Sequence, residues 1–363
     1  MWRRQATGTA PGSPRQAVRP LSAMAGGLVL AGLLAACGSS GSSSASASSH
    51  HSNVAVTIGY ENNGADPSMV TIHNGYFQKE LGSNVTTKIF TSGPTALSAI
   101  ASGALQFMCG IGLPPVISAL ARGVPLVVVW NQERYTTDAG IVVKSGSGIT
   151  SLAGLAGKTI AITTGSEASF ELPTLLAQKG VSLSSVHQLN MSPPQMESAW
   201  ETGQIQAAIV WDPAFDALRA KGGTVLATDA SLPPTASSFN ICVANTSFTK
   251  AHPQAAVGFV KAMQDGVAYW QSHPSQALSI MESEAGISAS TAQTELKGYQ
   301  IYDLTDQTSP TVLGTGSQVK TSGTTQSLTN NWKELYKQGF ITVPPPANMS
   351  RYVDPVPAQD AQK

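Results

Sequence analysis

Three short segments rich in glycine, serine and proline could bind a small anion through backbone amides. They are residues 92–95, 112–115 and 164–169, and each stands where a predicted strand gives way to a predicted helix. A helix N-terminus carries about half a positive charge and unpaired N–H groups, which suits sulfonate, sulfate or nitrate without a basic side chain. The same residue types are also ordinary helix caps. Together, at strand ends of an open α/β sheet, they favour an anion site. The candidate residues of this first group are Ser92, Gly93, Thr95, Gly112, Leu113, Gly165, Ser166, Glu167 and Ser169.

Aromatic and acidic residues end other predicted strands and could bind the rest of such a ligand. Tyr60 and Glu61 end the first strand, Trp130 ends a later one, and Trp211 directly precedes Asp212. Carboxylates would suit an ammonium group, although Asp212 could equally cap the helix that follows it. The candidate residues of this second group are Tyr60, Glu61, Trp130, Asp138, Trp211, Asp212 and Asn240.

Residue patterns typical of enzymes are not recognisable in the sequence. The six histidines are scattered, and we find no Ser-His-Asp arrangement, no mechanism-specific carboxylate pair and no Cys/His spacing of a zinc site. We therefore expect a binding protein without enzymatic activity, cofactor or metal.

The elements that must position these residues alternate between short β-branched runs and amphipathic segments. Parallel sheets covered on both faces are the architecture that this alternation predicts, in the α/β class. Prolines that open helices, as in Asp66-Pro67 and His252-Pro253, mark several starts. From 252 to about 339 the pattern is helical only, and residues 344–363 are predicted to form a Pro-rich extended tail. The predicted strands are 54–60, 85–90, 106–109, 126–130, 140–143, 159–162, 186–189, 207–210, 224–226 and 239–243.

The N-terminus predicts export and a lipid anchor. Arginines precede an apolar run that is too short for a comfortable membrane span, and the run ends in Leu34-Ala35-Ala36-Cys37. This ending resembles a bacterial lipobox, which implies a signal peptide over 1–36, lipidation of Cys37 and a membrane-anchored, extracytoplasmic protein. Residues 37–53 form a Ser/Gly linker. Without the four signal arginines the chain has 17 basic and 21 acidic residues, which argues against a nucleic-acid partner.

From residue 56 onward the chain resembles the taurine, aliphatic-sulfonate and nitrate branch of ABC-transporter solute-binding proteins. The resemblance rests on residues 92–103, 145–149 and 152–160, on Trp211-Asp212-Pro213, and on 337–341 before the Pro-rich tail. It implies a two-lobed type II periplasmic-binding-protein fold with two hinge crossings, near 138–142 and 237–240. The first lobe would comprise 54–139 and 241–343, and the second 140–240.

The same resemblance implies a monomer that captures a small anion, such as an alkanesulfonate, taurine or nitrate, for a permease and an ATPase. Taurine binders tend to have Phe-Asp where this chain has Phe239-Asn240, which disfavours an aminosulfonate. A thiamine-type pyrimidine or another small heteroaromatic ligand, and a sensory role, remain alternatives. Cys109 and Cys242 are expected as buried free cysteines; in this fold their strands often adjoin, so a disulfide is the alternative.

Overall fold

The protein is described here by a computed structural model that covers residues 54–232 and 239–363. The predicted signal peptide, Cys37, the linker and part of the second predicted crossing lie outside the described residues. Both sheets belong to one unit, residues 50–363. In the described part of the chain, no helix is long and apolar enough to cross a membrane.

The first sheet has the strand order β11-β4-β10-β3-β1-β2. β1, β2 and β3 pair in parallel, whereas β10 is antiparallel to both β3 and β4, and β11 is antiparallel to β4. The sheet is therefore mostly parallel, in agreement with the α/β architecture predicted from the sequence, and β10 and β11 run against the common direction. The strands are β1 (Val56–Glu61), β2 (Val85–Phe90), β3 (Phe107–Ile111), β4 (Leu126–Tyr135), β10 (Asn240–Asn245) and β11 (Tyr299–Ile301).

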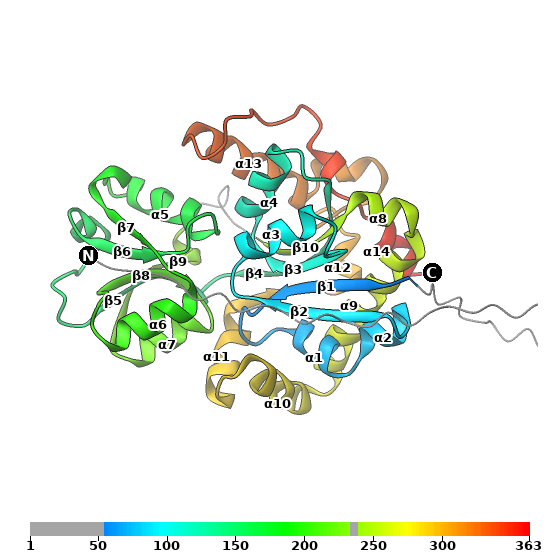
Figure 1. Cartoon of the computed structure of the whole chain (residues 1–363), viewed down its shortest axis with the longest axis horizontal. Coiled ribbons are helices and arrows are strands. Elements are labelled where there is room, and N and C mark those ends of the chain that lie inside the picture. Colours follow the sequence, from blue (N-terminus) through cyan, green and yellow to red (C-terminus); the bar gives the residue numbers. More distant parts are fainter. Residues whose placement is uncertain (1–53, 233–238) are drawn as a thin grey trace, which may run out of the picture. The chain divides into compact units, whose positions relative to one another are not determined.

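Helices cover both faces of this sheet, because alternate side chains of each buried strand point to opposite faces. Figure 1 shows α3 and α4 on one side of this sheet and α9 on the other. Along β3, Phe107 and Cys109 pack in the core with α9, while Met108 and Ile111 pack in the core with α3 and α4. The helices of this lobe are α1 (Pro67–His73), α2 (Tyr76–Leu81), α3 (Gly93–Ala101), α4 (Leu113–Ala121), α8 (Thr246–Ala251), α9 (Pro253–Ser272), α10 (Pro274–Ala285), α11 (Ala289–Gly298), α12 (Leu304–Gln307), α13 (Gly323–Lys337) and α14 (Val356–Ala361).

The second sheet has the strand order β7-β6-β8-β5-β9. β6 pairs in parallel with β7 and β8, and β5 is antiparallel to β8 and β9. The elements of this second lobe are β5 (Ala139–Lys144), β6 (Thr159–Ile162), β7 (His187–Asn190), β8 (Ala207–Trp211), β9 (Gly223–Thr228), α5 (Ala168–Ala177), α6 (Pro193–Glu201) and α7 (Ala214–Ala220).

The chain passes from the first sheet to the second at residues 136–138, between β4 and β5. It returns after the short 3₁₀ helix Asp229–Ser231, and β10 then re-enters the first sheet between β3 and β4. Asp138, which the sequence places near the first crossing, is the last residue of that connection.

The C-terminal third differs from its prediction in two places. The segment after 252 contains the three-residue strand β11, which pairs with the end of β4. The predicted extended tail instead ends in α14, which packs against α9 with Ala358 fully buried. Val353 also bridges to Val128 of β4, so the tail is part of the first lobe.

Candidate ligand-binding site

A pocket with a cavity volume of about 30 Å³ is lined by both lobes at the carboxyl ends of their strands. Glu61 ends β1, Gly112 precedes α4, Ser166 precedes α5 and Trp211 ends β8. The lining residues are Glu61, Asn63, Gly93, Gly110, Gly112, Pro115, Tyr135, Ala139, Ser166, Glu167, Glu171, Trp211 and Asn240.

Three carboxyl groups dominate the polar chemistry of this lining, which contains no lysine, arginine or histidine. Burial raises the pKa of Glu61 well above its usual range, and the nearby charge of Glu167 raises it further. Burial, with the charge of Asp229 next, likewise raises the pKa of Glu171. A buried carboxylate is costly unless it meets a positive charge. The pocket is therefore poor for a bare anion and favourable for a ligand that carries a cationic group.

The helix openings contribute fewer free amides than the sequence predicts. The N–H of Gly93, at the start of α3, already donates to the Glu61 carboxyl group. The first turn of α4 contains Pro114 and Pro115, which have no N–H to donate. At the start of α5, the N–H of Gly165 donates to Ser169 Oγ, at 2.8 Å. These contacts therefore do not favour anion binding by three equivalent helix ends.

Seven of the predicted residues line the pocket: Glu61, Gly93, Gly112, Ser166, Glu167, Trp211 and Asn240. Asn240 Nδ2 donates to Glu133 Oε1 at 2.8 Å, and Glu133 is fully buried. Asn240 has no carboxyl group of its own but is hydrogen-bonded to that of Glu133. The Glu133 side chain does not line the pocket. Ser166 Oγ donates to the Thr163 carbonyl at 2.7 Å.

The other predicted residues lie outside the pocket lining, for reasons of strand and helix geometry. Tyr60 precedes Glu61 in β1, and neighbouring strand residues face opposite sides of a sheet. Trp130 was expected to end its strand, but β4 continues to Tyr135, so Trp130 is a fully buried core residue. Asp138 and Asp212 contact each other beside the pocket. The residues outside the lining are Tyr60, Ser92, Thr95, Leu113, Trp130, Asp138, Gly165, Ser169 and Asp212.

The hydroxyl groups of the first candidate group mostly bond within their own turns. Thr95 Oγ1 donates to the Ser92 carbonyl at 2.6 Å, and Ser92 itself is buried. Leu113 is a core residue of the first lobe. Gly165 and Ser169 line a neighbouring surface hollow together with Pro94 and Ser166.

Sequence reasoning missed Asn63, Gly110, Pro115, Tyr135, Ala139 and Glu171. One of them had a local signal: Glu171 stands four residues after Glu167, a spacing that places two side chains on one face of a helix. Tyr135 could be placed in the pocket only from the full length of β4. Gly110 could be placed there only from the pairing of β3 with its neighbouring strands.

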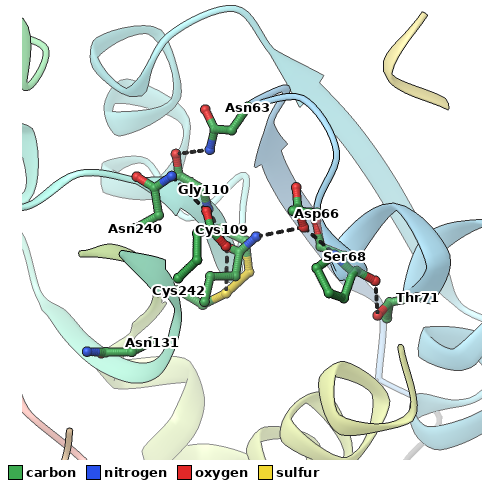
Figure 2. The surroundings of a disulfide bond; sticks show 12 residues. Asn63, Asp66, Ser68, Thr71, Cys109, Gly110, Asn131, Asn240 and Cys242 are labelled. Carbon is green, nitrogen blue, oxygen red and sulfur yellow. Dashed lines mark hydrogen bonds between the residues drawn. A yellow bond between two sulfur atoms is a disulfide. The ribbon is translucent and has the colours of Figure 1, made fainter. Parts of the chain in front are cut away.

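A disulfide between Cys109 and Cys242 lies directly behind the pocket, so the expectation of free cysteines is wrong. It joins β3 to β10, which are adjacent in the sheet. Figure 2 shows Gly110 and Asn240 close to this bond, with Asn63 Nδ2 donating to the Gly110 carbonyl at 2.8 Å. The disulfide thus ties together two strands that both present pocket residues.

Comparison with known families supports the architecture. Residues 62–277 match the family described as NMT1/THI5 like. The chain belongs to this NMT1/THI5-like family. The resemblance and the α/β fold predicted from the sequence are thereby confirmed at the level of family and architecture.

Several relatives of this NMT1/THI5-like chain are described as binding proteins for taurine or for aliphatic sulfonates. The taurine-binding periplasmic protein of Escherichia coli (strain K12) is 25% identical over 301 residues, which are 79% of this chain and 93% of that protein. The alkanesulfonate-binding protein SsuA of Xanthomonas axonopodis pv. citri, solved bound to MOPS, has a TM-score of 0.67 at 21% identity, covering 82% of this chain and 97% of that one. The periplasmic aliphatic sulphonate binding protein SsuA of Escherichia coli has a TM-score of 0.64 at 21% identity, covering 83% and 97%.

Proposed function

We propose that this protein is the extracytoplasmic solute-binding component of an ABC importer, anchored by a lipid on Cys37, and that it captures a small aminosulfonate of the taurine type. The importer's permease and ATPase would be its partners. The chain's relatives named for binding taurine and aliphatic sulfonates support the sulfonate part of this proposal.

The observation that carries the choice of an aminosulfonate is the acidic pocket. Glu61, Glu167 and Glu171 all line it, without a basic side chain in the lining. An ammonium group would neutralise part of this charge in a water-poor site, where an ion pair is stronger than in bulk water. The sulfonate would then face the start of α5 at Ser166, where the helix dipole is favourable. A plain alkanesulfonate or an inorganic anion offers nothing to the carboxyl groups.

Taurine and ethanesulfonate form a matched pair of probes, because they differ only in the amino group. We expect taurine to bind at least about tenfold more tightly by isothermal titration calorimetry, a difference of about 1.4 kcal/mol. Glu61→Gln should remove most of this preference, whereas Glu201→Gln, an exposed residue paired with Lys221, should leave it unchanged. Equal affinity for the two ligands in the wild-type protein would refute the aminosulfonate proposal.

The pH dependence has a defined sign. The raised pKa of Glu61 means that this carboxyl group binds a proton more readily than an exposed one. An ammonium ligand prefers the ionised carboxylate, so its binding must release that proton. Affinity for taurine should therefore rise with pH between about 5 and 8, with proton release detectable in buffers of different ionisation enthalpy. A flat profile would show that no carboxyl group of the pocket meets the ligand's charge.

A small heteroaromatic ligand with a basic nitrogen is the second candidate, because Tyr135 and Trp211 line the pocket beside the carboxyl groups. An aminopyrimidine could stack on such rings and share a proton with Glu61. Including an aminopyrimidine in the same titrations separates the two: a ligand that stacks on Trp211 should quench tryptophan fluorescence, and taurine has no ring to do so.

A further inference from the structure

A second group of carboxyl side chains lies next to the pocket without lining it. Asp212 follows β8, Asp216 is in α7, and Glu295 is in α11. Each offers one oxygen, and these three oxygens lie within 4.8 Å of one another. Two of the residues come from the second lobe and one comes from the first, so the group spans the two lobes.

One oxygen of this group, Glu295 Oε1, is buried and accepts no hydrogen bond from the described residues, and its side chain is 0% exposed. The main chain holds the other oxygen of Glu295 and one oxygen of Asp212. Asp212 Oδ1 accepts from the Asp216 N–H at 3.0 Å, and Glu295 Oε2 accepts from the Ala65 N–H at 2.7 Å. Each carboxyl group is therefore fixed in place by a main-chain N–H, and Glu295 keeps one oxygen for another partner.

Acidic side chains surround the group, and one cation, Arg219, pairs with Asp216. The Asp138 carboxyl group hydrogen-bonds to Asp212, and Asp66 also acts on Glu295 through its charge. Arg219 Nη1 donates to Asp216 Oδ1 at 2.5 Å.

We propose that Asp212, Asp216 and Glu295 bind a hard divalent cation, namely Ca²⁺, between the two lobes. The donor set consists of oxygens alone, which suits Ca²⁺ better than a metal that prefers nitrogen or sulfur. Ca²⁺ also accepts irregular geometry and six to eight ligands, which Asp138 and water could complete. Extracytoplasmic Ca²⁺ sites commonly operate at dissociation constants of about 0.1–1 mM, so a site with three carboxylates is sufficient there.

The bound ion would connect α7 of the second lobe to α11 of the first. Its binding should therefore protect both segments together in hydrogen–deuterium exchange, residues 214–220 and 289–298. An ion held by one lobe alone would protect one of these segments and leave the other unchanged.

The purified protein is first treated with EDTA and then titrated with Ca²⁺ in the absence of any organic ligand. Binding is followed by thermal shift and by calorimetry. At about pH 7.5, Ca²⁺ up to about 5 mM should raise the melting temperature and produce a saturable heat. No shift and no heat at pH 7.5 would overturn the proposal.

Asp212→Asn and Glu295→Gln keep the side-chain size and remove charge from a repulsive cluster, so both variants should fold. Each should weaken Ca²⁺ binding at least tenfold, and Glu201→Gln, with its exposed carboxyl group, should not. If Glu61→Gln abolishes Ca²⁺ binding and Glu295→Gln does not, the cation belongs to the pocket and the proposed site is wrong. Because taurine is absent throughout, a failure here leaves the proposed solute-binding function untouched, and the converse also holds.

Discussion

Removing the Cys109–Cys242 disulfide should cost several kcal/mol of unfolding free energy. The two cysteines are 133 residues apart, and the closed loop contains the whole described part of the second lobe. A cross-link of this span restricts the unfolded chain by about 5 kcal/mol in the chain-entropy model, and measured losses for native disulfides are typically about 2–5 kcal/mol. We therefore expect a loss of about 3–5 kcal/mol for Cys109→Ala/Cys242→Ala, measured by urea denaturation of a chain that begins after Cys37.

Both sulfurs lie in the core, with Cys109 1% and Cys242 0% exposed, so alanine also leaves a small void. Comparing the oxidised and reduced forms of the unsubstituted chain separates the two effects, because only the cross-link differs between them. The cross-link alone should supply most of the loss. Two free thiols in the protein purified from an oxidising compartment would refute the disulfide. A difference below about 1 kcal/mol between the two forms would refute the loop-closure reasoning.

Two further predictions address the pocket and the anchor. A Cβ at Gly112 would lie 1.8 Å from Glu167 Oε2, so in Gly112→Ala the Glu167 carboxyl group must move from its place in the pocket. Taurine binding should then weaken about 10- to 100-fold, since a hydrogen bond to a charged group is worth about 1.5–3 kcal/mol. Gly154→Ala, whose Cβ has no neighbour closer than 3.7 Å, is the matched control, and an equal loss in both variants would contradict the clash. Cys37→Ala should abolish membrane retention without changing the taurine affinity of the purified protein; unchanged retention would exclude the lipid anchor.

The strands could be predicted from sequence where local pattern is sufficient. The segments 85–90 and 159–162 are β2 and β6 with the predicted bounds, because β-branched residues there are bounded by turn-forming residues. The starts of α1 at Pro67 and of α9 at Pro253 could also be predicted from local sequence, because proline suits the first turn of a helix whatever the helix packs against.

Where an element ends in the tertiary structure was harder to predict. β4 continues past Trp130 because β10 and β11 pair with its far end, and this extension moves Trp130 into the core and Tyr135 into the pocket. α14 forms because it packs against α9, which lies about 90 residues earlier in the chain. The prolines of the tail give no sign of this contact in the sequence.

The α/β class, the family resemblance, the order of the elements and seven of the residues that line the pocket could be predicted from the amino-acid sequence. These follow from periodicity, caps and short motifs, which depend on neighbours along the chain. Tertiary structure alone decided that Cys109 meets Cys242, that the pocket is acidic, and that Asp212 lies beside Glu295. Each of these depends on a distance between residues far apart in sequence, and such a distance exists only once both sheets have formed and packed.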